Sequence, residues 1–290
     1  MSYDSKKKEY QNKMDTIRKE TQQESKKLLV KLLFSFFLLI VFPLLGIAAL
    51  FFLVLPSVKK LSNTGQRMKE EVGQDIIQDI MGELFDSYEF LPECRLSDEI
   101  IHSVAIPGLT DYNTVSGNDY TKGVFHGLNF LMSDIHLTDV HEYTDAEGNE
   151  RSEVKERFNG LWFVCDFAKQ IDSTITVSPR TRFSLKKGIA LESEQFCRKM
   201  LVESDSEHDV FYVLTPSLME HILTSMEQMK CRMYFCFTQQ GQVHILADRG
   251  NALEVDMASE QAEQLHEQFS QQLRQVTDII DQLRLSEAYH

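Results

Sequence analysis

The sequence lacks the motifs of several common enzyme classes. It has no G-x-x-x-x-G-K-[S/T] or G-x-G-x-x-G stretch, which argues against the usual phosphate-binding loops. It also has no G-x-S-x-G nucleophile elbow and no H-E-x-x-H zinc motif. We therefore expect a non-enzymatic protein, with no cofactor and no metal centre.

Cysteine is scarce and irregularly placed. There are 5 cysteines among 290 residues, and an odd number without repeated spacing is a poor disulfide framework. We expect most of them to be small buried side chains in a reducing compartment. This favours a domain that faces the cytoplasm.

Positive charge is in deficit beyond the first 60 residues. Residues 1–60 carry 11 Lys/Arg against 5 Asp/Glu, a net +6, whereas residues 61–290 carry 19 against 39, a net −20. An acidic surface of that size repels nucleic acid, so we exclude DNA or RNA as a partner. The basic segment lies beside an apolar stretch, where it can meet anionic lipid headgroups.

That apolar stretch, Leu32–Leu55, has no charged residue in its 24 positions. About 20 apolar residues cross a ~30 Å hydrocarbon core as a helix, so the stretch predicts one transmembrane helix, kinked at Pro43. The alternative is a re-entrant hairpin hinged at Pro43 and Gly46. Its arms of about 12 residues would rise ~18 Å each, too little for two full crossings.

The flanking charges and the cysteines disagree about sidedness. Near the apolar stretch the N-terminal flank has six Lys/Arg and the C-terminal flank four, which favours a cytoplasmic N-terminus and, for one span, an external domain. Reduced cysteines favour a cytoplasmic domain. A hairpin would remove the conflict, because both of its flanks would then be cytoplasmic. We expect a single-pass cell-membrane protein with its soluble domain on the cytoplasmic side.

Four segments follow from these patterns. They are a polar basic segment at 1–31, the transmembrane helix at 32–55, a linker at 56–62 and an acidic α+β domain at 63–290. Within that domain, helical periodicity predicts helices over 63–90, 97–104, 191–202, 216–229 and 259–285. A period of two or short apolar runs predict strands over 120–127, 128–143, 158–167, 173–177, 211–214, 232–237 and 242–247.

The predicted fold is α+β, a mainly antiparallel sheet with flanking helices. The residues 145–149 (DAEGN) indicate a polar loop tip, and Gly160 indicates a bulge or a close backbone approach. The apolar stripe of the last helix suits packing on the sheet or a coiled coil.

Several blocks carry a resemblance to a known family. They are Ile106–Leu109 (IPGL), Phe158–Phe167 (FNGLWFVCDF), Leu214–Glu220 (LTPSLME), the turn at Gly241 and Asp278–Leu283 (DIIDQL). Over roughly residues 80–285 the chain resembles a bacterial membrane-associated family of unknown function, which carries the automated label "galanin". The resemblance implies a bacterial, membrane-anchored α+β domain and supplies no catalytic residues. Several family members have two N-terminal hydrophobic segments, whereas this chain has one.

Three residues are candidates for binding: Asp119, His136 and Asp166. The two carboxylates lie beside apolar strands, where a raised pKa would suit acid–base work. Capping of turns, or pairing with Lys122 or Lys169, is the ordinary alternative. No strand face brings three metal ligands together around His136.

We therefore expect a membrane-anchored binding or scaffold domain without enzymatic activity. Its expected partners are the lipid bilayer and either another protein or a second copy of the chain. The alternative is a membrane-tethered enzyme or small-ligand sensor that uses the polar face of the sheet.

Overall fold

The computed structural model describes residues 3–41, 50–68, 73–144, 149–180, 187–250 and 262–285. The chain divides into two compact units. Unit 1 comprises Met1–Ile80 and Glu254–Gln268, and unit 2 comprises Met81–Leu253 and Phe269–His290.

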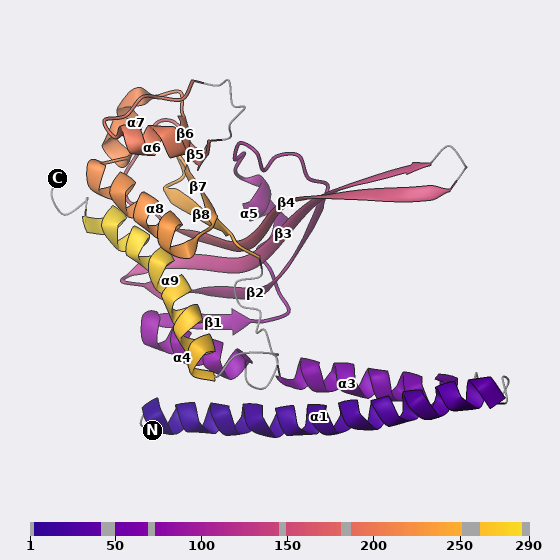
Figure 1. Cartoon of the computed structure of the whole chain (residues 1–290). Helices are drawn as coiled ribbons and strands as arrows, with labels where there is room; N and C mark the ends of the chain where they lie inside the picture. Colours follow the sequence, from indigo (N-terminus) through magenta and orange to yellow (C-terminus); the bar gives the residue numbers. More distant parts are fainter. Residues whose placement is uncertain are drawn as a thin grey trace. The chain divides into compact units, whose positions relative to one another are not determined.

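Unit 1 is helical in its described part. Its elements are α1 (Tyr3–Val41), the short π-helix η1 (Leu50–Val54), α3 (Leu55–Met68) and most of α4 (Gln74–Leu84). The helices α1 and α3 lie side by side (Figure 1). The Lys31 Nζ donates a hydrogen bond to the Ser57 Oγ at 2.7 Å, and the Lys60 Nζ lies 3.1 Å from the Glu24 Oε1.

The prediction of one transmembrane helix over 32–55 is wrong. Lys31 and Ser57 are 26 residues apart, which would place them about 39 Å apart along a single helix, yet their side chains are hydrogen-bonded. The chain therefore folds back between them. Pro43 and Gly46, the predicted hinge of the alternative hairpin, lie outside the described residues. In the part of the chain that the structure describes, no helix is both long enough and apolar enough to span a membrane.

Unit 2 contains one sheet of eight strands in the order β1-β2-β3-β4-β8-β7-β5-β6, and every neighbouring pair is antiparallel. The predicted α+β class and antiparallel sheet are confirmed. The strands are β1 (Ser87–Leu91), β2 (Thr114–Phe125), β3 (Leu128–Thr144), β4 (Glu150–Asp166), β5 (Ile175–Pro179), β6 (Met200–Glu203), β7 (Arg232–Phe237) and β8 (Gln242–Asp248).

In the residues that the structure describes, unit 2 also contains four whole helices and most of a fifth, α9. They are α5 (Asp98–His102), α6 (Glu194–Lys199), α7 (Glu207–Val213), α8 (Pro216–Met229) and α9 (Ala262–Leu285). Figure 1 shows α8 and α9 running together across the sheet. Buried residues of α9, Val276 and Ile280 among them, confirm that its stripe packs inside unit 2.

One apolar cluster joins α5 and its neighbouring loops to the centre of the sheet. Ile101 from α5 packs with Ile135, Trp162 and Leu246, which come from three adjacent strands. On β4, Gly160 permits a close approach, since an added Cβ would lie 2.1 Å from the Ala247 carbonyl oxygen. This confirms the predicted meaning of that glycine.

Three local predictions are wrong. Residues 87–91 form strand β1 rather than the end of a helix, and residues 200–203 form strand β6 rather than the end of another. Residues 211–214 do not form a strand, because Phe211–Val213 end helix α7. By contrast, the predicted helices at 97–104 and 216–229 and the predicted strands at 232–237 and 242–247 are confirmed as α5, α8, β7 and β8. Ser97 caps α5 and Thr215 caps α8.

Candidate functional site

An apolar surface covers one section of unit 1. Large apolar side chains are exposed along residues 29–37 of α1 and along residues 52–58 of η1 and α3; we call these two segments the apolar helix pair. Eleven of the sixteen exposed large apolar side chains of the described residues belong to it: Leu29, Val30, Leu32, Leu33, Phe34, Phe36, Phe37, Phe52, Leu53, Leu55 and Val58.

The buried side chains of the apolar helix pair include two serines as well as Val54, whereas large apolar side chains lie outside. Ser35 is fully buried and Ser57 is 7% exposed, whereas Phe36 is 64% exposed. The Ser57 hydroxyl donates to the Leu53 carbonyl at 2.7 Å while it accepts from Lys31. Proteins surrounded by water usually place large apolar side chains inside and polar ones outside. This pair reverses that order, and large exposed apolar patches mark contact with an apolar partner.

Lysines lie at the base of the apolar helix pair on both helices. Glu24 of α1 accepts from Lys27 at 3.0 Å and from Lys60 of α3 at 3.1 Å. The hydrogen bond from Lys27, followed by that from Lys60, lowers the pKa of the Glu24 carboxyl. This carboxylate therefore stays ionised at neutral pH and links the two helices.

The polar first half of α1 is tied to α4 within unit 1. Asp79 accepts from the Lys6 Nζ at 2.7 Å and from the Tyr10 hydroxyl at 2.6 Å. Burial opposes ionisation of Asp79, but these two hydrogen bonds outweigh it and lower the carboxyl pKa. Burial, with the same carboxylate, raises the pKa of Tyr10. A second ion pair joins Lys13 and Asp75 at 3.0 Å.

A second prominent feature is the outer part of strands β3 and β4. Residues 139–144 pair with residues 150–155 and project from the sheet as a two-stranded ribbon, which we call the arm (Figure 1). Among the described residues, no third strand pairs with either side of it. Tyr143 and Val154 are 52% and 59% exposed on the arm.

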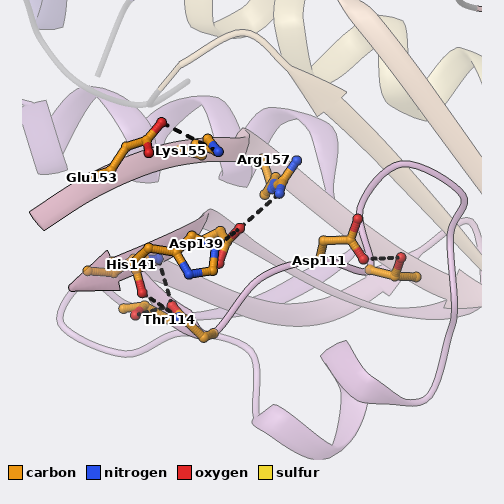
Figure 2. A network of polar contacts seen from close by, with 10 residues as sticks. Asp111, Thr114, Asp139, His141, Glu153, Lys155 and Arg157 are labelled. Carbon is orange, nitrogen blue, oxygen red and sulfur yellow. Dashed lines mark hydrogen bonds and ion pairs between the residues drawn. The ribbon is translucent and has the colours of Figure 1, made fainter. Parts of the chain in front are cut away.

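A polar network holds the base of the arm (Figure 2). The Arg157 Nη2 donates to the Asp139 Oδ2 at 2.9 Å, and the His141 Nε2 lies 3.0 Å from the same oxygen. The hydrogen bond from Arg157 is the main cause that lowers the pKa of Asp139. Asn113 closes the edge of β3, since its side chain both donates to the Val140 carbonyl and accepts from the Val140 amide.

A bulge explains why Arg157 reaches Asp139. The register of β3 and β4 shifts between Leu137 and Thr138, which leaves Arg157 as the extra residue of β4. Bulges re-aim side chains and increase local twist. An isolated two-stranded ribbon is only marginally stable, so these contacts at its base favour a stiff projection.

The three predicted binding residues lie at separate places. Asp119 is 6% exposed in a bulge of β2, has a φ of 58° and accepts from the Asn118 side chain at 2.7 Å. His136 is half-buried on β3, and its Nε2 lies 2.9 Å from the Glu156 Oε2. Asp166 ends β4 and accepts from the Asn129 side chain at 2.8 Å.

His136 and Asp166 do not converge on one site. Asn129 and His136 are seven residues apart on β3, which separates them, and therefore Asp166 from His136, by about 23 Å. Successive side chains of a strand alternate between faces, and the pairing places His136 and Asp166 on opposite faces of the sheet. A binding role for any one of the three stays a prediction. The described residues contain no group of three or more His, Cys, Asp or Glu placed to hold a metal ion.

Sequence reasoning missed the buried histidine His244. It is fully buried on β8, where its Nδ1 accepts from the Trp162 Nε1 at 3.1 Å. Burial lowers the pKa of His244 to about 4, so the ring is neutral at pH 7. The sequence around a histidine in an apolar strand does not show whether its ring is buried, as that of His244 is, or exposed.

Residues 156–285 match a known family, described as protein of unknown function (DUF3137). The match begins near the base of the arm and extends to the end of α9. This match supports the predicted resemblance to a family of unknown function over residues 156–285. Residues 80–155, which the prediction also included, lie outside the match.

Two further comparisons complete these findings. A crystal structure of the mycobacterial trehalose monomycolate transport factor A, TtfA, has 12% sequence identity and a TM-score of 0.37. The alignment covers 72% of this chain and 93% of that one. At this TM-score the likeness carries no argument about function. No curated protein matches the chain.

Proposed function

We propose that this chain is a bacterial membrane-attached binding protein without enzymatic activity. The apolar helix pair enters the hydrocarbon of the bilayer from one side and returns to that side, and unit 2 binds a protein partner through the arm. The observation that carries the proposal is the inverted polarity of the helix pair, with phenylalanine and leucine outside and serine inside. Hydrocarbon solvates such an outer surface, and small polar residues between helices are typical of membrane helix contacts.

The length of the apolar section fits one leaflet. Residues Leu32 to Val41 of α1 rise about 15 Å along the helix axis. The hydrocarbon core is roughly 30 Å thick, so this section reaches about its middle. Membrane attachment in this form needs no spanning helix, and it replaces the single-pass topology expected from the sequence.

Vesicle flotation of the full-length chain tests the proposal. We compare the parent with a Phe36→Ser/Phe37→Ser variant on neutral phosphatidylcholine vesicles. Each buried phenylalanine contributes about 1.5–3 kcal/mol, so we expect the double variant to partition at least ~10²-fold more weakly. Phe211→Ser is the matched control, because Phe211 is 50% exposed but lies in unit 2. A parent that does not float, or a double variant that floats like the parent, contradicts the proposal.

Cysteine labelling in intact bacterial cells tests the topology. The five native cysteines are replaced, and a single cysteine is introduced as Lys8→Cys or Asn149→Cys, both at exposed positions. We expect an impermeant maleimide to label neither in intact cells and both after lysis. Labelling of only one position in intact cells contradicts the hairpin. Labelling of both contradicts the cytoplasmic side.

The alternative function is a membrane-tethered enzyme or small-ligand sensor built on Asp119, His136 and Asp166. Their separation, with each side chain held by a different partner, argues against a shared site. For this reason we propose binding rather than catalysis.

A further inference from the structure

The lysines that bracket the apolar helix pair form a second recognition feature. Between residues 26 and 60 the chain has five lysines and no aspartate or glutamate. They are Lys26, Lys27, Lys31, Lys59 and Lys60. All five lie at the two ends of the uncharged stretch, three before it and two after it.

The fold brings these two groups together. The hydrogen bond between Lys31 and Ser57 aligns the two ends of the uncharged stretch, and Lys60 of α3 reaches Glu24 of α1. The lysines of both helices therefore lie at the same end of the apolar helix pair, which is its base. We call these five residues the lysine collar.

The collar keeps a net positive charge after its internal ion pairs are counted. Glu24 forms ion pairs with two lysines of the collar, Lys27 and Lys60. Residues 24–60 contain these five lysines and one glutamate, so their formal net charge is +4. Lys26 and Lys59 are exposed, one on each helix.

We propose that the lysine collar binds the phosphates of anionic phospholipid headgroups and so selects anionic membranes. This inference rests on the proposed insertion of the apolar helix pair. If the apolar residues lie in hydrocarbon, the collar lies at headgroup level, about 15 Å from the bilayer centre. Long lysine side chains extend from such positions into the interface.

The expected gain follows from the electrostatics of anionic surfaces. Each lysine near such a surface strengthens binding about fivefold at physiological salt, and the effect decays within a Debye length of roughly 8 Å. Two lysines therefore strengthen binding to anionic vesicles about 25-fold. The hydrocarbon contacts contribute equally on neutral and on anionic vesicles, so the two effects are separable.

The experiment measures binding of the full-length chain to neutral phosphatidylcholine vesicles and to vesicles with about one third phosphatidylglycerol. Lys26→Gln/Lys59→Gln removes two collar charges without breaking an interhelical contact. Lys8→Gln/Lys187→Gln is the matched control, because both lysines are exposed and lie outside the collar. We expect the collar variant to bind anionic vesicles about 25-fold more weakly and neutral vesicles unchanged. The control should change by less than threefold.

Salt provides the second measurement. The preference of the parent for anionic vesicles should shrink as ionic strength rises from 0.1 to 0.5 M, because salt screens exposed charges. Equal affinity for neutral and anionic vesicles overturns the collar but leaves hydrocarbon insertion intact. Equal losses for the collar and control variants also overturn it. Absence of binding to both kinds of vesicle overturns the insertion and the collar together.

Discussion

The two units use the same residue types in opposite ways. In the sheet, Phe130, Phe158 and Phe163 are at most 2% exposed and pack against one another or against neighbouring aromatic rings. In the apolar helix pair, Phe36 and Phe37 are more than 60% exposed. Composition therefore does not decide where an apolar side chain lies. The proposed insertion of the helix pair into hydrocarbon would account for the difference between the two surfaces.

The largest expected effect is the difference in the free energy of unfolding when a phenylalanine is removed from the sheet or from the apolar helix pair. Phe163 is fully buried and its ring stacks on Phe130 with centroids 5.2 Å apart. Phe163→Ala should lower the free energy of unfolding by about 3–5 kcal/mol, because it leaves a cavity. Phe36→Ala should change it by less than about 0.5 kcal/mol in detergent-free buffer, since that ring contacts little protein.

Urea titration of each full-length variant, followed by tryptophan fluorescence, checks this contrast. Trp162 is the single tryptophan and lies in the sheet. Comparable destabilisation by the two substitutions would remove the distinction between the units.

An intermediate effect concerns the arm, which is exposed like the helix pair but polar. If the arm contacts a protein partner, a photo-reactive residue at position 154 should form a discrete adduct in living cells. The same photo-reactive residue at position 211, which is an exposed phenylalanine in the parent, should give at least tenfold less adduct. Equal adducts at both positions, or none at 154, would argue against the arm as the partner contact.

The smallest effect concerns the polar half of α1. The pKa of Asp79 is lowered in the folded state, so its ionised form stabilises the fold. This stabilisation is present above the ordinary aspartate pKa of 3.8 and is lost as the pH falls below that value. Asp79→Asn should lower the free energy of unfolding by about 1 kcal/mol at pH 7 and by less at acidic pH, where the carboxylate is protonated. Hydrogen exchange of the α1 amides at both pH values measures this. A loss of protection that is independent of pH would contradict the role of the charge.

The strands were predictable where their local pattern was strong. The apolar run of β4 and the Gln240–Gly241 turn of the β7–β8 hairpin carry short-range signals that agree with the sheet. Residues 150–157 of β4 carry none, because both faces of the arm are exposed and the sequence there is charged. Polar strands of this kind look like loops, since there is no buried face to create a period of two.

The errors at β1, β6 and α7 have physical causes. Residues 87–91 become a strand because they pair with β2, a partner about 30 residues away that local propensity does not see. Residues 200–203 pair likewise with β5. At α7, Ser206 accepts from the Asp209 amide at 3.2 Å and starts a helix, whereas a four-residue apolar run alone fits either structure.

The sequence predicted the residues of the candidate site but not their arrangement. The sequence by itself determined the uncharged stretch, the lysines at its two ends and the acidic character of the rest, because these are properties of composition along the chain. Only the tertiary structure decided that the stretch folds back, that Ser35 and Ser57 are buried in it and that the two groups of lysines lie at the same end of the helix pair. The reason is that a fold-back depends on contacts between residues such as Lys31 and Ser57, 26 positions apart, whereas periodicity reports only neighbours within a few turns.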